Sequence, residues 1–477
     1  MKMMNSTSLL LAGLALTTTA AFGKAIPKNA KASLVLGQVD FISNLAPMPP
    51  NAASLSNPSS VIVDPVTLKV FVAEEGNDRV LRYASAAALA NGAQAEAVFG
   101  QELFNTQTTA VTSNQFGGDP ESIFLDTKGR LWVPDHSGNR VLRFDCASFC
   151  DSSPSASRVY GQPDFATSTA ATTSSGMTGP YGVCVDSADR LWVADSGNNR
   201  VLRFDSITTK PSGGAADGVL GQANFTTGTA GSGNNGMDFP TGVTTSAGGS
   251  LYVTCSYAHR VMRFDNASGL GANAPASAVL GQPDFATVTA GTTAVTMRYP
   301  RGAWITPDDS LWVVDTLNNR VLRFNNASTK LSGAAADGVL GQANFTSGSS
   351  DITQRGMFYP GYRPFVDTTG SLWIADSVNN RVLRFLPDAT RPLLAVTAPP
   401  AKVTKNPKLL IKGTASDAYG ISKVEYRIGN GPLQLAKGTT SWSFTAKLNQ
   451  GKNKITIFAT DKNDNPSVSS IFKITRK

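Results

Sequence analysis

The chain has 477 residues and the composition of a β-rich globular protein. Charged residues make up only 16% and apolar residues 41%, and there are 44 glycines. This balance excludes an intrinsically disordered chain, which has few apolar residues and many charges. The net charge of +8 is unevenly spread: residues 398–477 carry 14 Lys and Arg against 4 Asp and Glu, and the rest carries 28 against 30. The basic character therefore belongs to the C-terminal segment.

The first residues have the pattern of an export signal. Lys2 precedes an uncharged, largely apolar run from Ser8 to Ala21, and Ala21-Phe22-Gly23 fits a cleavage site. The run is too short to span a bilayer, and no other stretch is long enough. We therefore expect residues 1–23 to be a signal peptide. The mature protein is expected to be secreted, periplasmic or at the cell surface, without a transmembrane segment.

Internal repetition dominates residues 31–390. The phrase Asn-Arg-Val-Leu-Arg-Phe and its variants occur six times, 60 or 61 residues apart, and the phrase Val-Leu-Gly-Gln and its variants also occur six times. One unit contains four short runs of strand-forming residues, at 180–186, 191–195, 200–204 and 218–221, separated by turn residues. Four such strands form an antiparallel sheet that buries little by itself. Six units therefore predict an all-β, six-bladed propeller of four-stranded antiparallel blades.

The order of the phrases predicts how the ring closes. The chain begins with a fourth-strand phrase at residues 34–41, and the repeats end with a third-strand phrase at residues 381–385. Pairing the two phrases leaves no free sheet edge. The N-terminal strand is therefore expected to complete the last blade.

The repeats resemble a known family. Residues 191–205, Leu-Trp-Val-Ala-Asp-Ser-Gly-Asn-Asn-Arg-Val-Leu-Arg-Phe-Asp, are close to the signature of the NHL repeat, and so are residues 311–320. The resemblance implies a six-bladed propeller. It does not imply one function, because relatives include protein-binding and nucleic-acid-binding scaffolds as well as enzymes.

The residue pattern of the sequence changes after the repeats. Prolines indicate a linker at residues 391–400, and five strand-like runs with intervening turns follow within residues 401–477. This pattern predicts an immunoglobulin-like β-sandwich. Gly413-Thr-Ala-Ser-Asp417 and phrases near residues 451 and 459 resemble bacterial surface immunoglobulin-like modules.

The four cysteines fall into two groups. Cys146 and Cys150 lie close together between two strand patterns, and in an exported protein they are expected to form a loop disulfide. Half a zinc site is the rival interpretation, but no second pair of ligands lies nearby. Cys184 and Cys255 depart singly from the repeat, and their pairing stays open.

Repetition separates structural from functional residues. A residue present in every blade is expected to be structural, because a single binding site needs asymmetry. The repeated arginines and the acids at the end of strand two are therefore expected to form ion pairs or to cap turns between strands, and the repeated tryptophans are expected to pack. The acids are Asp135, Asp195, Asp315 and Asp376, and the tryptophans are Trp132, Trp192, Trp312 and Trp373.

The residue after each blade-opening proline varies and should rim the central channel. Among these residues Glu121 and Arg301 come from opposite blades. Blade six has one extra residue, so Tyr362 and Arg363 are expected near the same channel mouth. An exposed rim that varies freely is the alternative interpretation. The candidate binding residues at the channel mouth are Glu121, Tyr181, Thr241, Arg301, Tyr362 and Arg363.

Three further residues are secondary candidates. Blade four reads Cys-Ser-Tyr257-Ala-His259 where other blades read Asp-Ser-Gly-Asn-Asn, and blade two has His136 after its acid. These are the only histidines of the chain. Each could act as a ligand or a base, or could be an ordinary exposed turn residue.

These features favour a non-catalytic binding or scaffold protein. It would recognise an extracellular protein or glycan through one propeller face or the channel mouth. The basic C-terminal domain is expected to contact anionic envelope polymers or to act as a spacer. Export and a nearly neutral propeller oppose a nucleic-acid partner.

The alternative is a propeller enzyme, a metal-dependent hydrolase or lactonase or a lyase, with its site in the central channel. A calcium site needs about six to eight oxygen ligands, and Glu121 is the only carboxylate at the rim position. A zinc enzyme needs about three protein ligands, mostly histidine, and the chain has two histidines. No cofactor or metal ligand is therefore predicted, and calcium is the one metal left open.

Overall fold

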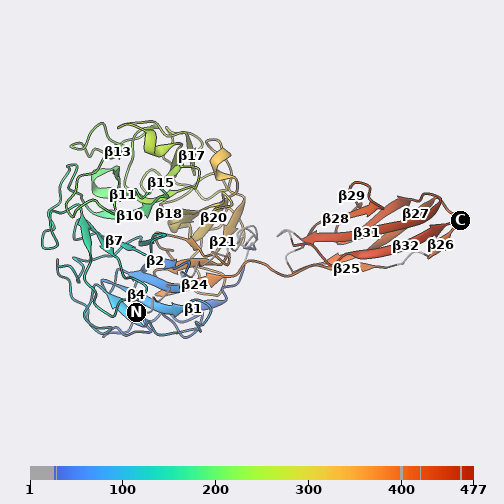
Figure 1. Ribbon diagram of the computed structural model, residues 1–477, viewed down its shortest axis with the longest axis horizontal. Helices are drawn as coiled ribbons and strands as arrows, with labels where there is room; N and C mark the ends of the chain where they lie inside the picture. The colour runs from blue at the N-terminus through green and yellow to red at the C-terminus, as the bar shows by residue number, and fades with distance from the viewer. Residues whose placement is uncertain (1–25, 28–29, 398–400, 419, 462–464) are drawn as a thin grey trace, which may run out of the picture.

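The computed structural model describes residues 26–27, 30–397, 401–418, 420–461 and 465–477. The expected signal peptide lies outside these residues. The strands build two bodies, a round arrangement of sheets and an elongated sandwich joined to it by a single connection (Figure 1). Among the described residues, no helix is long and apolar enough to cross a membrane.

Residues 34–385 form six four-stranded antiparallel sheets, consistent with a six-bladed propeller. From the innermost strand outward, blades one to three are β2 (Pro58–Val63), β3 (Lys69–Glu74), β4 (Arg79–Ser85) and β5 (Ala97–Phe99); β6 (Phe124–Leu125), β7 (Leu131–Asp135), β8 (Arg140–Phe144) and β9 (Arg158–Tyr160); and β10 (Pro180–Val185), β11 (Leu191–Asp195), β12 (Arg200–Phe204) and β13 (Gly218–Leu220). Blades four to six are β14 (Pro240–Thr245), β15 (Leu251–Cys255), β16 (Arg260–Phe264) and β17 (Ala278–Leu280); β18 (Pro300–Ile305), β19 (Leu311–Asp315), β20 (Arg320–Phe324) and β21 (Gly338–Leu340); and β22 (Phe365–Val366), β23 (Leu372–Asp376), β24 (Arg381–Phe385) and β1 (Leu34–Leu36). Four single-turn 3-10 segments are η1 (Ser196–Asn198), η2 (Ala267–Gly269), η3 (Thr316–Asn318) and η4 (Ala327–Thr329).

The N-terminal strand β1 completes the sheet of the last blade, and a hydrogen bond connects that blade to the first. β1 pairs antiparallel with β24, with Val35 opposite Leu383. The Ser377 hydroxyl of blade six donates to the Pro58 carbonyl of blade one at 2.7 Å. Equivalent serine or threonine hydroxyls join blade three to four, four to five and five to six.

A buried arginine organises each blade. In blade three, Arg200 Nε donates to Asp195 at 2.7 Å, and both side chains are fully buried. The same guanidinium donates to the carbonyls of Phe225, Thr173 and Gly176, which lie in the loops on either side of the blade. Matching pairs join Asp135 to Arg140, Asp315 to Arg320 and Asp376 to Arg381. The expected ion pairs are confirmed, and the repeated tryptophans are buried as expected.

Blade four departs from this pattern. Cys255 replaces the acid, and among the described residues Arg260 Nε has no hydrogen-bond partner. Asp238 lies close enough for the Arg260 charge to act on its carboxyl, although burial raises the pKa of Asp238 overall. The buried cation of blade four is therefore less well compensated than its five counterparts.

Breaking a buried pair should be costly. Asp315→Asn leaves Arg320 as an unpaired buried charge and is expected to lower the free energy of unfolding by about 3–5 kcal/mol. The half-exposed pair of Lys330 and Asp337 is the control, and Lys330→Ala should cost about 0–1 kcal/mol. Denaturant unfolding of the two variants measures both values. Equal losses would contradict a special role for the buried pair.

Restoring the missing acid should stabilise the protein. Cys255→Asp places a carboxylate opposite Arg260, where the other blades carry one, and is expected to raise the free energy of unfolding by about 1.5–3 kcal/mol. Cys255→Ser, which adds no charge, should not reproduce the gain. Thermal and denaturant unfolding compare the two variants with the wild type. A loss of stability on Cys255→Asp would show that Asp238 already satisfies the arginine.

The C-terminal body is a two-sheet sandwich. One sheet has the order β25 (Leu393–Val396), β27 (Lys408–Ser416), β30 (Ser441–Lys447), and the other β26 (Val403–Thr404), β32 (Ser470–Arg476), β31 (Gly451–Asp461), β28 (Ile421–Ile428), β29 (Gln434–Leu435). Trp442, Phe444 and Ile457 are buried between the sheets. β25 falls inside the linker expected at residues 391–400, and its residues pair with β27. The prolines on either side of this short apolar run indicated a linker, so the strand was not predicted.

The structure pairs Cys146 with Cys150 in a disulfide within the loop that follows β8. Cys184 and Cys255 are both buried free thiols. Each therefore serves as a small packing residue in its blade.

Candidate functional site

A hydrogen bond between blades positions the residue before each opening proline. In each blade the residue just before the third strand has a left-handed backbone conformation. Its side chain accepts a hydrogen bond from the backbone N–H of the residue that precedes the opening proline of the next blade. Asn199 accepts from Phe239, His259 Nδ1 from Tyr299 and Asn319 from Tyr359, at 2.8–3.1 Å. His259 therefore occupies the position of a structural asparagine, and its Nδ1 accepts a hydrogen bond from the backbone of Tyr299, a neighbour of the candidate residues.

The residues held in this way are strained in three blades. Phe239, Tyr299 and Tyr359 have φ of 51°, 57° and 56°, a region that bulky side chains rarely occupy. Each also precedes a proline, which disfavours the helical region. Blades one to three have Asn57, Asp119 and Gly179 at this position, residue types that adopt the left-handed conformation readily. Backbone strain of about 1–3 kcal/mol per residue is found where function requires it.

The aromatic side chains of the rim form a continuous set. Tyr257 stacks on Phe239 with ring centroids 4.6 Å apart, and Tyr299 lies 5.5 Å from Tyr257. Tyr181 lies 5.3 Å from Phe239 and 5.2 Å from Tyr362. The rings therefore extend from blade three to blade six beside the starts of the innermost strands.

Arg301 reaches into this set from blade five. Its guanidinium carbon lies 4.4 Å from the ring centroid of Tyr359 and 4.2 Å from that of Tyr362, and Nη2 donates to the Tyr359 hydroxyl at 2.7 Å. The two rings hold the cation by cation–π attraction. Arg301 Nε has no partner among the described residues.

Glu121 and Glu75 form a carboxyl pair opposite the arginine. Glu121 is 2% exposed. Burial, followed by the charge of Glu75, raises the pKa of Glu121 well above its usual range, although Arg301 opposes the shift. Burial also raises the pKa of Glu75, which hydrogen-bonds to Glu121 and accepts from Asn57 Nδ2 at 2.5 Å. Two close carboxylates cannot both ionise easily, so the pair favours sharing one proton, and the larger upward pKa shift is that of Glu121.

Glu75 and His136 occupy a position that is structural in the other blades. There, Ser196, Ser256, Thr316 and Ser377 donate to the proline carbonyl of the next blade. In blade one the Ser59 hydroxyl makes this bond to Pro120 instead, at 2.7 Å. The His136 ring lies 4.5 Å from that of Tyr181, and its Nδ1 has no partner among the described residues.

We call these residues the rim cluster. It comprises Glu75, Glu121, His136, Tyr181, Phe239, Tyr257, Tyr299, Arg301, Tyr359 and Tyr362. Glu75, Phe239, Tyr299 and Tyr359 were not among the sequence candidates. The signal for them was present in the aligned repeats, as aromatic residues before three opening prolines and as a glutamate in a serine position.

Two primary candidates lie elsewhere. Thr241 is buried, and its hydroxyl hydrogen-bonds within blade four to Ser256, whose hydroxyl donates to the Pro300 carbonyl of blade five. Arg363 is 1% exposed inside the ring, where its guanidinium donates to the Ser122 hydroxyl and to carbonyls of Val183 and Val243. Burial lowers the pKa of Arg363 to about 10. Its bonds tie blade six to blades two, three and four, so the expectation that it lies at the mouth is corrected to an interior structural position.

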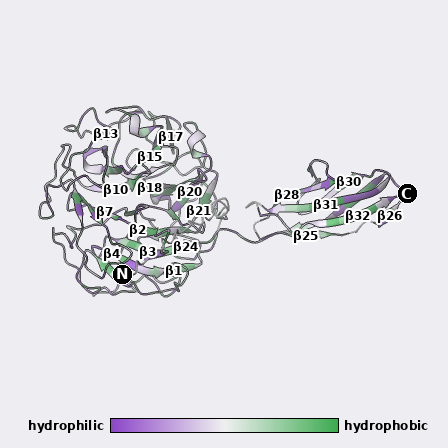
Figure 2. Ribbon diagram, in the orientation of Figure 1, coloured by the Kyte–Doolittle hydropathy of each residue, from purple (hydrophilic) through white to green (hydrophobic). Residues whose placement is uncertain are grey.

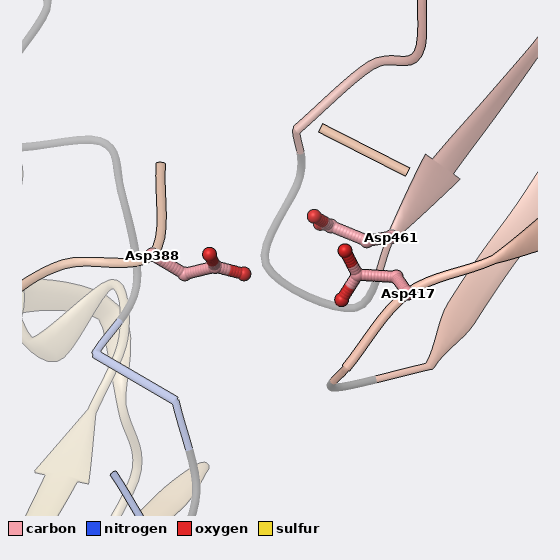
Figure 3. Close-up of side chains that lie close together, drawn as sticks. All are labelled: Asp388, Asp417 and Asp461. Atoms are coloured by element: carbon pink, nitrogen blue, oxygen red, sulfur yellow. The ribbon is translucent and has the colours of Figure 1, made fainter. Parts of the chain in front are cut away.

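Among the described residues, the group that could hold a metal ion lies away from the rim cluster. Asp388, Asp417 and Asp461 each offer an oxygen, and these oxygens lie within 4.8 Å of one another (Figure 3). Asp388 follows the last blade, and the other two lie at the end of the sandwich nearest the propeller. Asn465 donates to the Asp461 carboxylate and to the Asp388 carbonyl. Three carboxylates are fewer than the six to eight oxygens that Ca²⁺ takes.

Family comparisons agree with this architecture. The NHL repeat family matches residues 177–204, and the bacterial Ig domain family matches residues 392–457. The chain carries an NHL repeat and a bacterial Ig domain. The NHL match covers β10 to β12 of blade three, and the Ig match includes β25, which lies before the expected start of the module.

Solved structures with similar folds have low sequence identity to the chain. Virginiamycin B lyase from Staphylococcus aureus is 13% identical, with a TM-score of 0.40 over 69% of this chain and 95% of that chain. A protein of unknown function from Bacteroides thetaiotaomicron is 14% identical, with a TM-score of 0.46 over 74% and 75%. The fibronectin(III)-like modules of Clostridium thermocellum CbhA are 28% identical, with a TM-score of 0.16 over 18% and 97%. No curated protein matches the chain in sequence.

The proton on Glu121 should make stability depend on pH. Because its pKa is raised in the folded state, its contribution is present below pH about 4.5, the usual value for glutamate, and is lost as pH rises through the folded pKa. Other buried acids, including Asp376 with a pKa of about 6, act in the same direction. The difference between wild type and Glu121→Gln therefore isolates this residue.

Denaturant unfolding from pH 4 to pH 8 measures this difference. Glu121→Gln should lose less stability than the wild type as pH rises, because its amide cannot ionise. The exposed Glu102→Gln variant is the control and should follow the wild type. Parallel curves for Glu121→Gln and wild type would show that Glu121 carries no such proton.

Proposed function

We propose that the protein is a secreted, non-catalytic binding protein whose propeller recognises a glycan at the rim cluster. In this proposal the six sheets make a complete six-bladed ring, and the β1–β24 pairing closes it. The expected export signal and the bacterial Ig module support a location outside the cytoplasm. The rim cluster supplies the recognition surface.

The observation that carries the proposal is a set of unpartnered polar atoms beside the aromatic rings. Among the described residues, Glu121 Oε2, Arg301 Nε and His136 Nδ1 are buried without hydrogen-bond partners. Buried polar groups are normally satisfied, and an unsatisfied one costs about 1–3 kcal/mol. A bound ligand that donates and accepts hydrogen bonds would satisfy all three.

The balance of charge favours a neutral ligand with many hydroxyl groups. One proton on the carboxyl pair leaves it a single negative charge, which the cation of Arg301 offsets, while the carboxyl of Asp119 lies close by. Hydroxyl groups can both donate and accept, and the tyrosine rings offer apolar faces with polar edges. A sugar ring combines hydroxyl edges with an apolar C–H face, so a glycan segment fits both parts of the cluster.

An enzyme is the second candidate, and the carboxyl pair is the observation that favours it. Two carboxyl groups with different protonation states can act as general acid and base. Glu121 would then donate its proton to a glycan or lactone substrate, with Tyr181 nearby. Binding without turnover separates the first proposal from the second.

Binding is tested with the full mature chain against neutral cello-, chito- and manno-oligosaccharides, using calorimetry. We expect Tyr299→Ala to weaken the best ligand at least tenfold, because aromatic anchors dominate binding energy. Phe149→Ala, which removes an exposed aromatic ring outside the rim cluster, is the matched control and should bind as the wild type does.

Two results would change the proposal. Failure to bind any of these oligosaccharides would exclude the neutral glycan. Release of shorter products, lost in Glu121→Gln while binding persists, would establish the enzyme instead.

A further inference from the structure

The positive charge of the C-terminal module gathers at one end. The C-terminus lies at the end of the sandwich farthest from the propeller (Figure 1). Strand register brings nine cationic residues toward this end. Hydrophilic and hydrophobic residues alternate along the strands of the module (Figure 2). We call the nine cationic residues the basic tip: Lys402, Lys405, Lys408, Lys447, Lys452, Lys454, Lys473, Arg476 and Lys477.

Strand register explains why residues far apart in sequence meet there. Lys408 at the start of β27 lies opposite Lys447 at the end of β30. Lys454 near the start of β31 lies opposite Lys473 in the middle of β32, and β32 ends beside the start of β31. The backbone of β26 pairs with the end of β32, and this brings Lys402 and Lys405 to the same end.

The acidic groups of the module that the structure describes lie away from the basic tip. Asp417 and Asp461 lie at the end nearest the propeller, together with Asp388. Glu425 pairs with Lys423 at 3.1 Å in the middle of β28. Among the described residues, none of the nine cations of the basic tip takes part in an ion pair. The module is therefore electrically polarised along its length.

Two of the cross-strand pairs at the tip are unfavourable in the free protein. Lys408 lies directly opposite Lys447, and Lys454 directly opposite Lys473, and all four side chains are exposed. Like charges directly opposite each other on a sheet destabilise it. A bound polyanion would turn this repulsion into attraction for both partners.

We propose that the basic tip binds a linear polyanion, a polymer with phosphate or carboxylate groups along its chain. The two like-charge pairs lie on different sheets of the sandwich. A flat membrane surface would meet one sheet face or the end of the module, whereas a flexible chain can contact both faces. The module then attaches the propeller to the polymer by the end opposite the propeller and leaves the rim cluster open.

Binding of the full mature chain to polyphosphate and to polygalacturonate tests the proposal, with dextran as the neutral polymer. Calorimetry at 50 and 200 mM salt measures affinity. We expect binding to at least one polyanion, none to dextran, and a loss of at least about tenfold at the higher salt, because cation–polyanion contacts release counterions. Phosphate and carboxylate polymers bound with different affinity would identify the preferred anion.

Variants separate the tip from overall charge. Lys447→Glu/Lys473→Glu converts both like-charge pairs into Lys–Glu pairs, so we expect unchanged or higher thermal stability and at least tenfold weaker polymer binding. The control Lys412→Glu/Lys437→Glu makes the same change of net charge in the middle of the module, where both residues lie opposite Ser443, and should bind within about twofold of wild type. Tyr299→Ala should bind the polymer as wild type does, because the rim cluster is a separate site.

Three outcomes would overturn the proposal. The tip variant could bind as tightly as wild type, or the control could lose as much affinity as the tip variant. Preference for vesicles of 70% phosphatidylcholine and 30% phosphatidylglycerol over both polymers would assign the tip to membranes instead.

Discussion

The buried arginine of strand three is the interaction on which each blade depends. Arg200 shows the arrangement: one guanidinium bonds a carboxylate in its own blade and three carbonyls in the loops around it. The carboxylate in turn accepts the N–H of Thr178, two residues before the opening proline. The same network therefore fixes strands, loops and the residues that lead to the rim. This network recurs in every blade, with one acid missing in blade four. We call it the blade frame, and because it is present throughout, the side chains of the rim can vary without loss of the blade structure.

The rim cluster arises where single blades depart from that frame. Glu75 and His136 replace hydroxyl residues that join neighbouring blades elsewhere, and Tyr299 occupies a backbone conformation that an asparagine or glycine would adopt more easily. Each departure gives up a structural interaction or adds strain. Proteins commonly trade stability for activity or binding in this way.

Much of the architecture could be predicted from the sequence, because hydrophobic alternation and the repeat interval report strand positions directly. The strands of blade three and the ion pair of Asp195 with Arg200 were expected from the residues. Glu121, Tyr181, Arg301 and Tyr362 were predicted as departures, and the structure brings them together. Arg363 was also predicted as a departure from the repeat. Its long side chain reaches into the ring, where it is buried and donates hydrogen bonds to three acceptors. Sequence position alone did not report side-chain depth, and Glu75 and Tyr299 lay just outside the aligned position.

The central claim is that the rim aromatics serve a ligand and not the fold. Denaturant unfolding of Phe239→Asn, Tyr299→Asn and Tyr359→Asn tests it most directly, since asparagine adopts the left-handed conformation at lower cost. Each substitution is expected to raise the free energy of unfolding, by about 1 kcal/mol from relief of strain. A fall in stability in all three variants would contradict it, because the rings would then be part of the structural core.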